Sequence, residues 1–177
     1  MTAAARSDAV LTLTLAGVEA ALALCITFTP AHTATGGMIL VALWAAATAV
    51  LRGVSRTVLP VQRAHAAAAV LVCGAAGAQL AIGAEPLGLL ITLVAAAVVS
   101  AVISVIGSRS GNGSRERVDE NVYAVIAAVF VCAVVIVPHE SVHIVGLFGM
   151  YLAALAVFRG IAGLGYFHVR RGSTREL

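Results

Sequence analysis

The residues best suited to chemistry form one short motif, His139-Glu140-Ser141-Val142-His143. On an α-helix, the two histidines of such a motif lie on one face and can hold a zinc ion while the glutamate activates water. Here the motif directly follows Pro138, which indicates a turn, and catalytic zinc needs a third protein ligand. Zinc held by His139 and His143, with or without catalysis, is therefore one hypothesis.

The same motif belongs to a larger set of ionisable residues at three short breaks between apolar segments. These residues are His32, Glu85, His139, Glu140 and His143. Histidine takes up a proton near roughly pH 6.5 and glutamate near about 4.3, so acidification would turn the net charge of this set from negative to positive. One hypothesis is that the set senses or buffers external pH, and the other is that it only caps solvated turns.

Two further charges, Glu19 and Arg159, fall inside long apolar segments. A charge near the bilayer centre costs about 2.5–3.5 kcal/mol on insertion scales, and such groups are candidates for function. If both segments cross a membrane, the depths of the two residues differ by only about 3 Å. Glu19 is then either protonated or paired with Arg159. Its role is either structural or that of a proton relay.

The composition indicates which elements must position these residues. Of the 177 residues, 61% are hydrophobic and 11% are charged, and the mean hydropathy is +1.04. A soluble domain has roughly 45–50% apolar and about 25% charged residues, so lipid must be part of the solvent of this chain. The apolar runs are continuous and do not alternate with polar residues, which favours helices over a β-barrel. No room is left for a soluble catalytic domain, and we expect no enzyme.

The apolar runs predict an all-α polytopic membrane protein. We expect six transmembrane helices at approximately 9–29, 34–51, 64–83, 87–107, 121–137 and 142–167. They form one transmembrane domain over 1–177, built as three tandem two-helix hairpins at approximately 9–53, 64–107 and 121–167. The polar stretch 108–121 is predicted to be a flexible loop.

The basic residues predict the orientation. All 11 are arginines, and in a six-span arrangement all lie on one side or in that half of the membrane. The positive-inside rule then places both termini in the cytoplasm. The heavy use of alanine, valine and arginine without any lysine favours a bacterial inner (plasma) membrane. The formal net charge of +3 reflects arginines near anionic lipid, so the bilayer is the expected partner and nucleic acid is not.

An internal repeat supports the hairpin arrangement. The segments 47–54 and 154–161 are identical at five of eight positions, including Arg52 and Arg159. Each ends the second helix of a hairpin that contains a proline at its turn. The small residues Ala156 and Gly160 have the spacing that lets helices pack closely, either within the bundle or against a second copy or another membrane protein.

This repeat plan resembles the HdeD-like family of small bacterial membrane proteins, which is associated with acid resistance. The residues that carry the resemblance are the glycines and turn prolines of the three units: Gly17, Pro30 and Gly53; Gly77, Pro86 and Gly107; Pro138, Gly146, Gly149 and Gly160. The resemblance implies a non-enzymatic membrane protein without a cofactor, acting in acid or envelope stress. The alternatives are a small transporter or channel that uses Glu19, or a metal-binding or metalloprotease-like site at the His-Glu-x-x-His motif.

Overall fold

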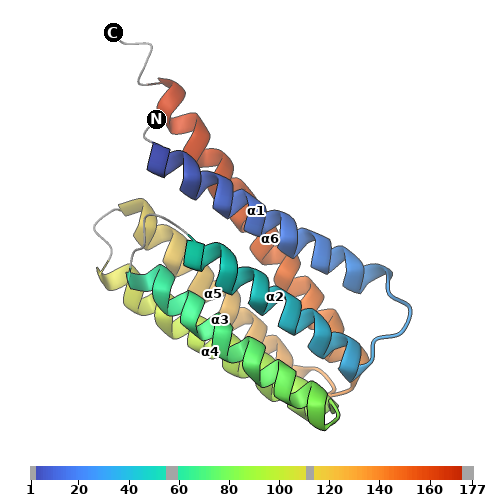
Figure 1. The fold of residues 1–177 in the computed structure, drawn as a ribbon. Helices are drawn as coiled ribbons and strands as arrows, with labels where there is room; N and C mark the ends of the chain where they lie inside the picture. The colour runs from blue at the N-terminus through green and yellow to red at the C-terminus, as the bar shows by residue number, and fades with distance from the viewer. Residues whose placement is uncertain (1–2, 55–59, 111–113, 173–177) are drawn as a thin grey trace.

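The computed structural model describes residues 3–54, 60–110 and 114–172, and this part of the chain forms six α-helices without any strand (Figure 1). The helices are α1 (Ala3–Phe28), α2 (Ala34–Val54), α3 (Pro60–Ile82), α4 (Pro86–Ser110), α5 (Ser114–Ile136) and α6 (Ser141–Gly172). Each contains an apolar stretch of 20 to 25 residues, which is long enough to cross the hydrocarbon core of a bilayer. The predicted all-α architecture with six membrane spans is confirmed.

The short turns are set by residues that stop one helix and start the next. Gly83 follows α3 with a φ of 97°, a left-handed conformation that glycine adopts without strain. Pro86 then opens α4 at the first helical position, where its missing N–H is not needed. At the start of α2, the Thr33 hydroxyl accepts a hydrogen bond from the Gly36 N–H at 3.1 Å.

The helices close into a ring of three pairs. α1 packs most extensively along α6, α2 along α3, and α4 along α5, and α2, α4 and α6 also contact one another. The two helices of each predicted hairpin are neighbours, but the closest packing joins successive hairpins and finally joins the last helix to the first (Figure 1). The second helix of every hairpin therefore lies toward the centre of the bundle.

Small residues bring α6 close to α1. A Cβ atom added at Gly149 would lie 2.8 Å from Ile26 Cγ2, and one added at Gly163 would lie 2.8 Å from Leu13 Cδ2. Ala156, midway between these glycines at a spacing of seven residues, is also buried. Within the bundle Gly160 takes no part in this close packing, because a Cβ added there would meet no atom within 4 Å. Packing of Gly160 against a second copy or another membrane protein stays a prediction.

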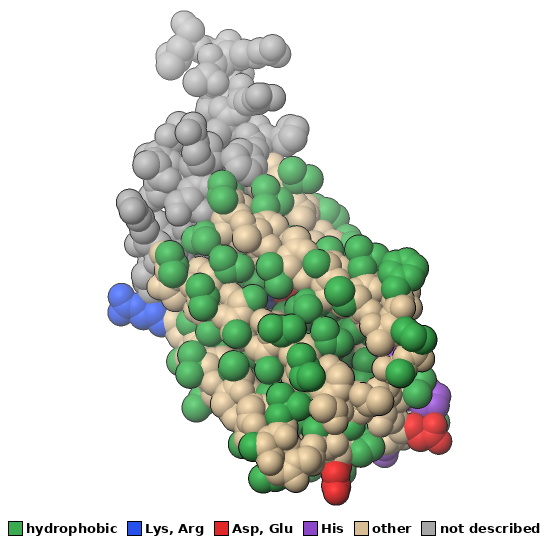
Figure 2. Space-filling model, turned by 45° about the vertical axis from the view of Figure 1, so that its right-hand side comes forward, with side chains coloured by type: hydrophobic (Ala, Val, Ile, Leu, Met, Phe, Trp, Pro, Cys, Tyr) green, Lys and Arg blue, Asp and Glu red, His purple; other side chains and the backbone are tan. Residues whose placement is uncertain are grey.

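The surface of the bundle is a wide apolar band with charged ends. Figure 2 shows hydrophobic side chains over most of the visible face, with acidic and histidine side chains at one end and basic side chains at the other. Large apolar residues such as Phe28, Leu71 and Ile136 are more than 70% exposed, which only a lipid environment makes favourable. The start of α1 and the end of α6 lie at the same end of the bundle as the ends of α2 and α4 (Figure 1).

All six helices extend further than the sequence predicts at one end or both, and the extensions of α2 and α5 change where charged residues lie. α2 continues to Val54 and α5 already begins at Ser114, so most of the predicted flexible loop at 108–121 is helical and only 111–113 lies outside the described residues. Arg52 and Glu120, which were expected in the connecting segments, are instead buried within helices. Arginine and glutamate are good helix formers, and their buried partners, described below, allow both to remain in the bundle.

Candidate functional site

Glu19 and Arg159, the two intramembrane charges found in the sequence, are in direct contact. Glu19 on α1 is fully buried and Arg159 on α6 is 4% exposed. The Arg159 guanidinium donates a hydrogen bond to Glu19 Oε1, and the Trp44 indole N–H of α2 donates to the same oxygen at 3.2 Å. One carboxylate oxygen thus joins three helices.

Tyr123 on α5 extends this contact to a second arginine. Its hydroxyl oxygen accepts a hydrogen bond from Arg159 Nε–H at 2.9 Å. The guanidinium carbons of Arg159 and Arg52 lie 5.0 Å and 5.9 Å from the centre of the Tyr123 ring, distances at which cation–π attraction is significant. Arg52 also donates a hydrogen bond to Gln62 Oε1 at 2.9 Å.

A second ionisable pair lies between the neighbouring helices. His65 Nε2 on α3 is 3.6 Å from Glu120 Oε2 on α5 and 3.4 Å from Ser104 Oγ on α4. All three residues are buried. We refer to the residues of both pairs and their partners as the buried polar cluster: Glu19, Trp44, Arg52, His65, Ser104, Glu120, Tyr123 and Arg159. Every helix contributes to this cluster.

Most of the cluster was not predicted from the sequence. Arg52 is the repeat counterpart of Arg159, but the predicted span that precedes it ends at residue 51, so the sequence places Arg52 in a connecting segment. His65 and Glu120 stand near the ends of predicted spans, where polar residues ordinarily reach water, so nothing in the pattern separates them from surface residues. The internal repeat is the one sequence feature that indicates burial of Arg52, because it aligns Arg52 with Arg159, which falls inside a predicted span.

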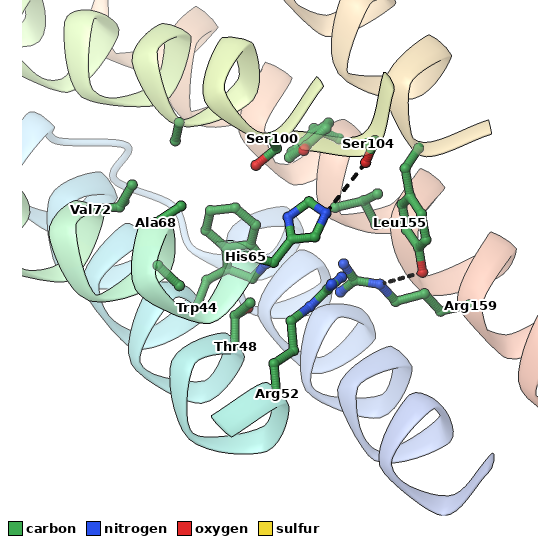
Figure 3. A pocket seen from close by; sticks show the side chains of 14 residues that line it. Trp44, Thr48, Arg52, His65, Ala68, Val72, Ser100, Ser104, Leu155 and Arg159 are labelled. Atoms are coloured by element: carbon green, nitrogen blue, oxygen red, sulfur yellow. Dashed lines mark hydrogen bonds between the residues drawn. The ribbon is translucent and has the colours of Figure 1, made fainter. Parts of the chain in front are cut away.

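A small cavity adjoins the cluster (Figure 3). Its volume is about 40 Å³, which is enough for a few water molecules or a small ion but not for an organic solute. The polar part of its wall includes Thr48, Arg52, His65, Ser104 and Arg159. Figure 3 shows the Arg52 and Arg159 side chains converging from α2 and α6 beside the His65 ring.

The predicted pH-responsive residues lie at the turn end of the bundle, where several of them cap helices. The ring of His32 is half-buried, and its Nε2 donates a hydrogen bond to the carbonyl of Ile26 near the end of α1, at 2.9 Å. The Glu85 carbonyl accepts from Leu89 N–H at 3.0 Å and so begins α4. His143 Nδ1 lies 3.8 Å from Glu140 Oε2, and both side chains are exposed.

The His-Glu-x-x-His motif is divided between a turn and a helix. α6 begins at Ser141, so His139 and Glu140 precede the helix and the two histidines do not share a helical face. Within the described ranges, no group of three or more histidine, cysteine, aspartate or glutamate residues has the arrangement of a metal site. Zinc binding by His139 and His143 stays a prediction.

Comparison with protein families, curated proteins and solved structures finds no match for this chain. The structure itself defines the class, which is a multi-pass, all-α integral membrane protein. The resemblance to the HdeD-like family stays a prediction.

Proposed function

We propose that this chain is a non-enzymatic membrane protein of the HdeD-like type that acts in acid or envelope stress. It lies in a bacterial inner membrane with both termini in the cytoplasm, so its three short turns face outward. The observation that carries the proposal is the chemistry of these turns, whose charged residues are histidines and glutamates only: His32, Glu85, His139, Glu140 and His143.

Acid acts on this set by changing contacts at the helix ends. A protonated His32 donates a charge-assisted hydrogen bond to the Ile26 carbonyl, and a positive charge is favourable beside the C-terminus of a helix. A protonated His143 forms an ion pair with Glu140 until that carboxylate is itself protonated. Mild acid thus tightens two turns and makes the outer face more positive, which changes its attraction for a partner.

The test is a histidine NMR titration of the protein in nanodiscs between pH 8 and pH 4. We expect acidification to shift the backbone signals of the α1–α2 and α5–α6 turns together. The variants His32→Gln and His143→Gln each remove one of these responses. Titration of the histidines without any backbone response would show that they are solvated caps and would refute the proposal.

Transport of protons is the second candidate, and the buried polar cluster beside a water-sized cavity favours it. Intramembrane ionisable groups next to water are the usual components of proton pathways. Proton flux into liposomes that is lost in Glu19→Gln, but kept in the exposed-arginine variant Arg63→Gln, would support this function. Liposomes that are as tight to protons with the protein as without it would exclude the second candidate.

A further inference from the structure

The wall of the cavity carries positive charge and hydrogen-bond donors. Among the described residues that line it, two are arginines and none is an aspartate or glutamate. The hydroxyl groups of Thr48 and Ser104 belong to the same wall. The two glutamates of the buried polar cluster, Glu19 and Glu120, stand behind this wall, where they contact Arg159 and His65.

Arg52 is a buried charge whose hydrogen bonds, within the described residues, do not match it with an opposite charge. Its side chain is buried, and the one hydrogen-bond acceptor it has in the described part of the chain is the neutral amide of Gln62. Its Nε–H is buried without a hydrogen-bond partner, as is the hydroxyl of Thr48 one helical turn earlier. Arginine cannot lose its proton in a protein, and although Glu19 and Glu120 are close enough to act on its charge, neither carboxylate accepts a hydrogen bond from Arg52 in the described part of the chain. The unmet need of Arg52 is therefore a hydrogen-bond acceptor inside the cavity.

We propose that this cavity is a binding site for a small monovalent anion of halide size, such as chloride, which is taken up together with a proton on His65. Arg52 Nε–H and the Thr48 hydroxyl donate to the anion, and Arg159 adds a second positive charge from across the cavity. The volume of about 40 Å³ admits such an ion and excludes larger organic anions. The site does not depend on the proposed role in acid stress.

The uptake of a proton together with the anion follows from the balance of the buried charges. Arg52 and Arg159 balance Glu19 and Glu120 when His65 is neutral, so an added anion leaves one buried negative charge in excess. Glu120 from α5 lies 3.6 Å from His65, and the two arginines approach from α2 and α6. Protonation of His65 forms an ion pair with Glu120 and restores neutrality, so anion and proton each favour the binding of the other.

The single tryptophan of the chain supplies the measurement, because Trp44 lines the cavity. Bromide quenches indole fluorescence by the heavy-atom effect and is close to chloride in size. The purified protein in nanodiscs is titrated with bromide at constant ionic strength, with the bulky anion gluconate as replacement. We expect saturable quenching of Trp44 that chloride reverses by competition.

Three variants decide the result. Arg52→Gln should weaken bromide binding at least about tenfold, because it removes the charge and the Nε–H donor. Thr48→Val keeps every charge and the shape of the side chain, and should weaken binding about threefold through the lost donor. Arg63→Gln removes an exposed arginine of α3 and should leave the affinity unchanged.

Quenching that rises linearly with bromide and is equal in the wild type and Arg52→Gln would show that only water occupies the cavity, and would overturn the proposal. If Arg52→Gln does not fold, an unchanged affinity in Thr48→Val overturns it equally.

The apparent affinity should rise as the pH falls from 8 to 5, and His65→Gln should abolish this dependence. An affinity that is the same at both pH values would overturn the uptake of a proton.

Discussion

At the scale of single residues, one carboxylate oxygen determines how three helices meet. Glu19 Oε1 accepts hydrogen bonds from Arg159 and from Trp44, so α6 and α2 are both fixed to α1 at this point. A buried ion pair contributes little net stability compared with apolar packing, but loss of one partner leaves an unpaired charge in the bilayer. The pair therefore specifies how the helices associate more than it stabilises their association.

Replacement of Glu19 by glutamine tests this account. Glu19→Gln keeps the size of the side chain and an oxygen for Trp44, but it leaves the Arg159 charge without a counter-charge. We expect the free energy of unfolding to fall by about 3–5 kcal/mol, measured by SDS unfolding in mixed micelles. The double variant Glu19→Gln/Arg159→Met should recover most of this loss. If the double variant instead loses the sum of the free energies that the two single variants lose, the two residues act independently.

Tyr123 makes two separable contributions to the same cluster. Tyr123→Phe removes the hydroxyl that accepts from Arg159 Nε but keeps the ring near both guanidinium groups. We expect this variant to lose about 1.5–3 kcal/mol of unfolding free energy and Tyr123→Leu to lose more, since leucine also removes the cation–π contacts. If Tyr123→Phe and Tyr123→Leu lose the same free energy of unfolding in this experiment, the cation–π contacts of the ring do not contribute to stability.

At the scale of helices, the pairing follows surface shape. Without a hydrophobic driving force in lipid, helices associate where small residues let their backbones approach. Gly149 and Gly163 provide this surface on α6, and the Ile26 and Leu13 side chains of α1 occupy the space above them. The extensive contact between the first and last helices therefore depends on two glycines that have no polar role.

An alanine at Gly149 should consequently destabilise the bundle. The added Cβ would meet Ile26 Cγ2 at 2.8 Å and Ile26 Cβ at 3.3 Å, close to the backbone of α1, where little adjustment is possible. We expect a loss of about 1–3 kcal/mol in SDS unfolding. Gly146→Ala is the matched control, because it lies one turn away on the same helix with no atom within 4 Å. Equal effects at both positions would contradict tight packing of α6 on α1.

At the scale of the whole molecule, the closed ring gives the bundle two chemically different ends. One end carries the start of α1, the end of α6 and the exposed arginines Arg63 and Arg109, and the other carries the three short turns (Figures 1 and 2). The buried polar cluster involves Arg52 and Arg159, which occupy the last turns of membrane spans that run toward the first of these ends. Glu19 lies midway along the span Ala9–Phe28, so the charges of the cluster extend from the middle of the membrane toward this end.

Cysteine accessibility tests the proposed orientation. Alanine replaces Cys25, Cys73 and Cys132, and single cysteines are then introduced as Glu85→Cys or Arg109→Cys, at two exposed positions at opposite ends. A membrane-impermeant thiol reagent should label the Glu85→Cys protein in intact cells and the Arg109→Cys protein only after permeabilisation. The chain without cysteines is the control for background, and the reverse labelling pattern would place the termini outside.

The lipid environment, the number of spans and the end that carries the arginines can be predicted from the sequence, because apolar run length and charge placement are local properties of each segment. The sequence also indicated Glu19 and Arg159 as intramembrane charges. Only the tertiary structure decided that α1 packs on α6, and that Arg52, His65 and Glu120 are buried together. Whether a residue near a helix end is buried depends on which helices lie beside it. The sequence of a single segment does not contain this information, because the neighbours of each helix depend on how all six helices pack into the ring.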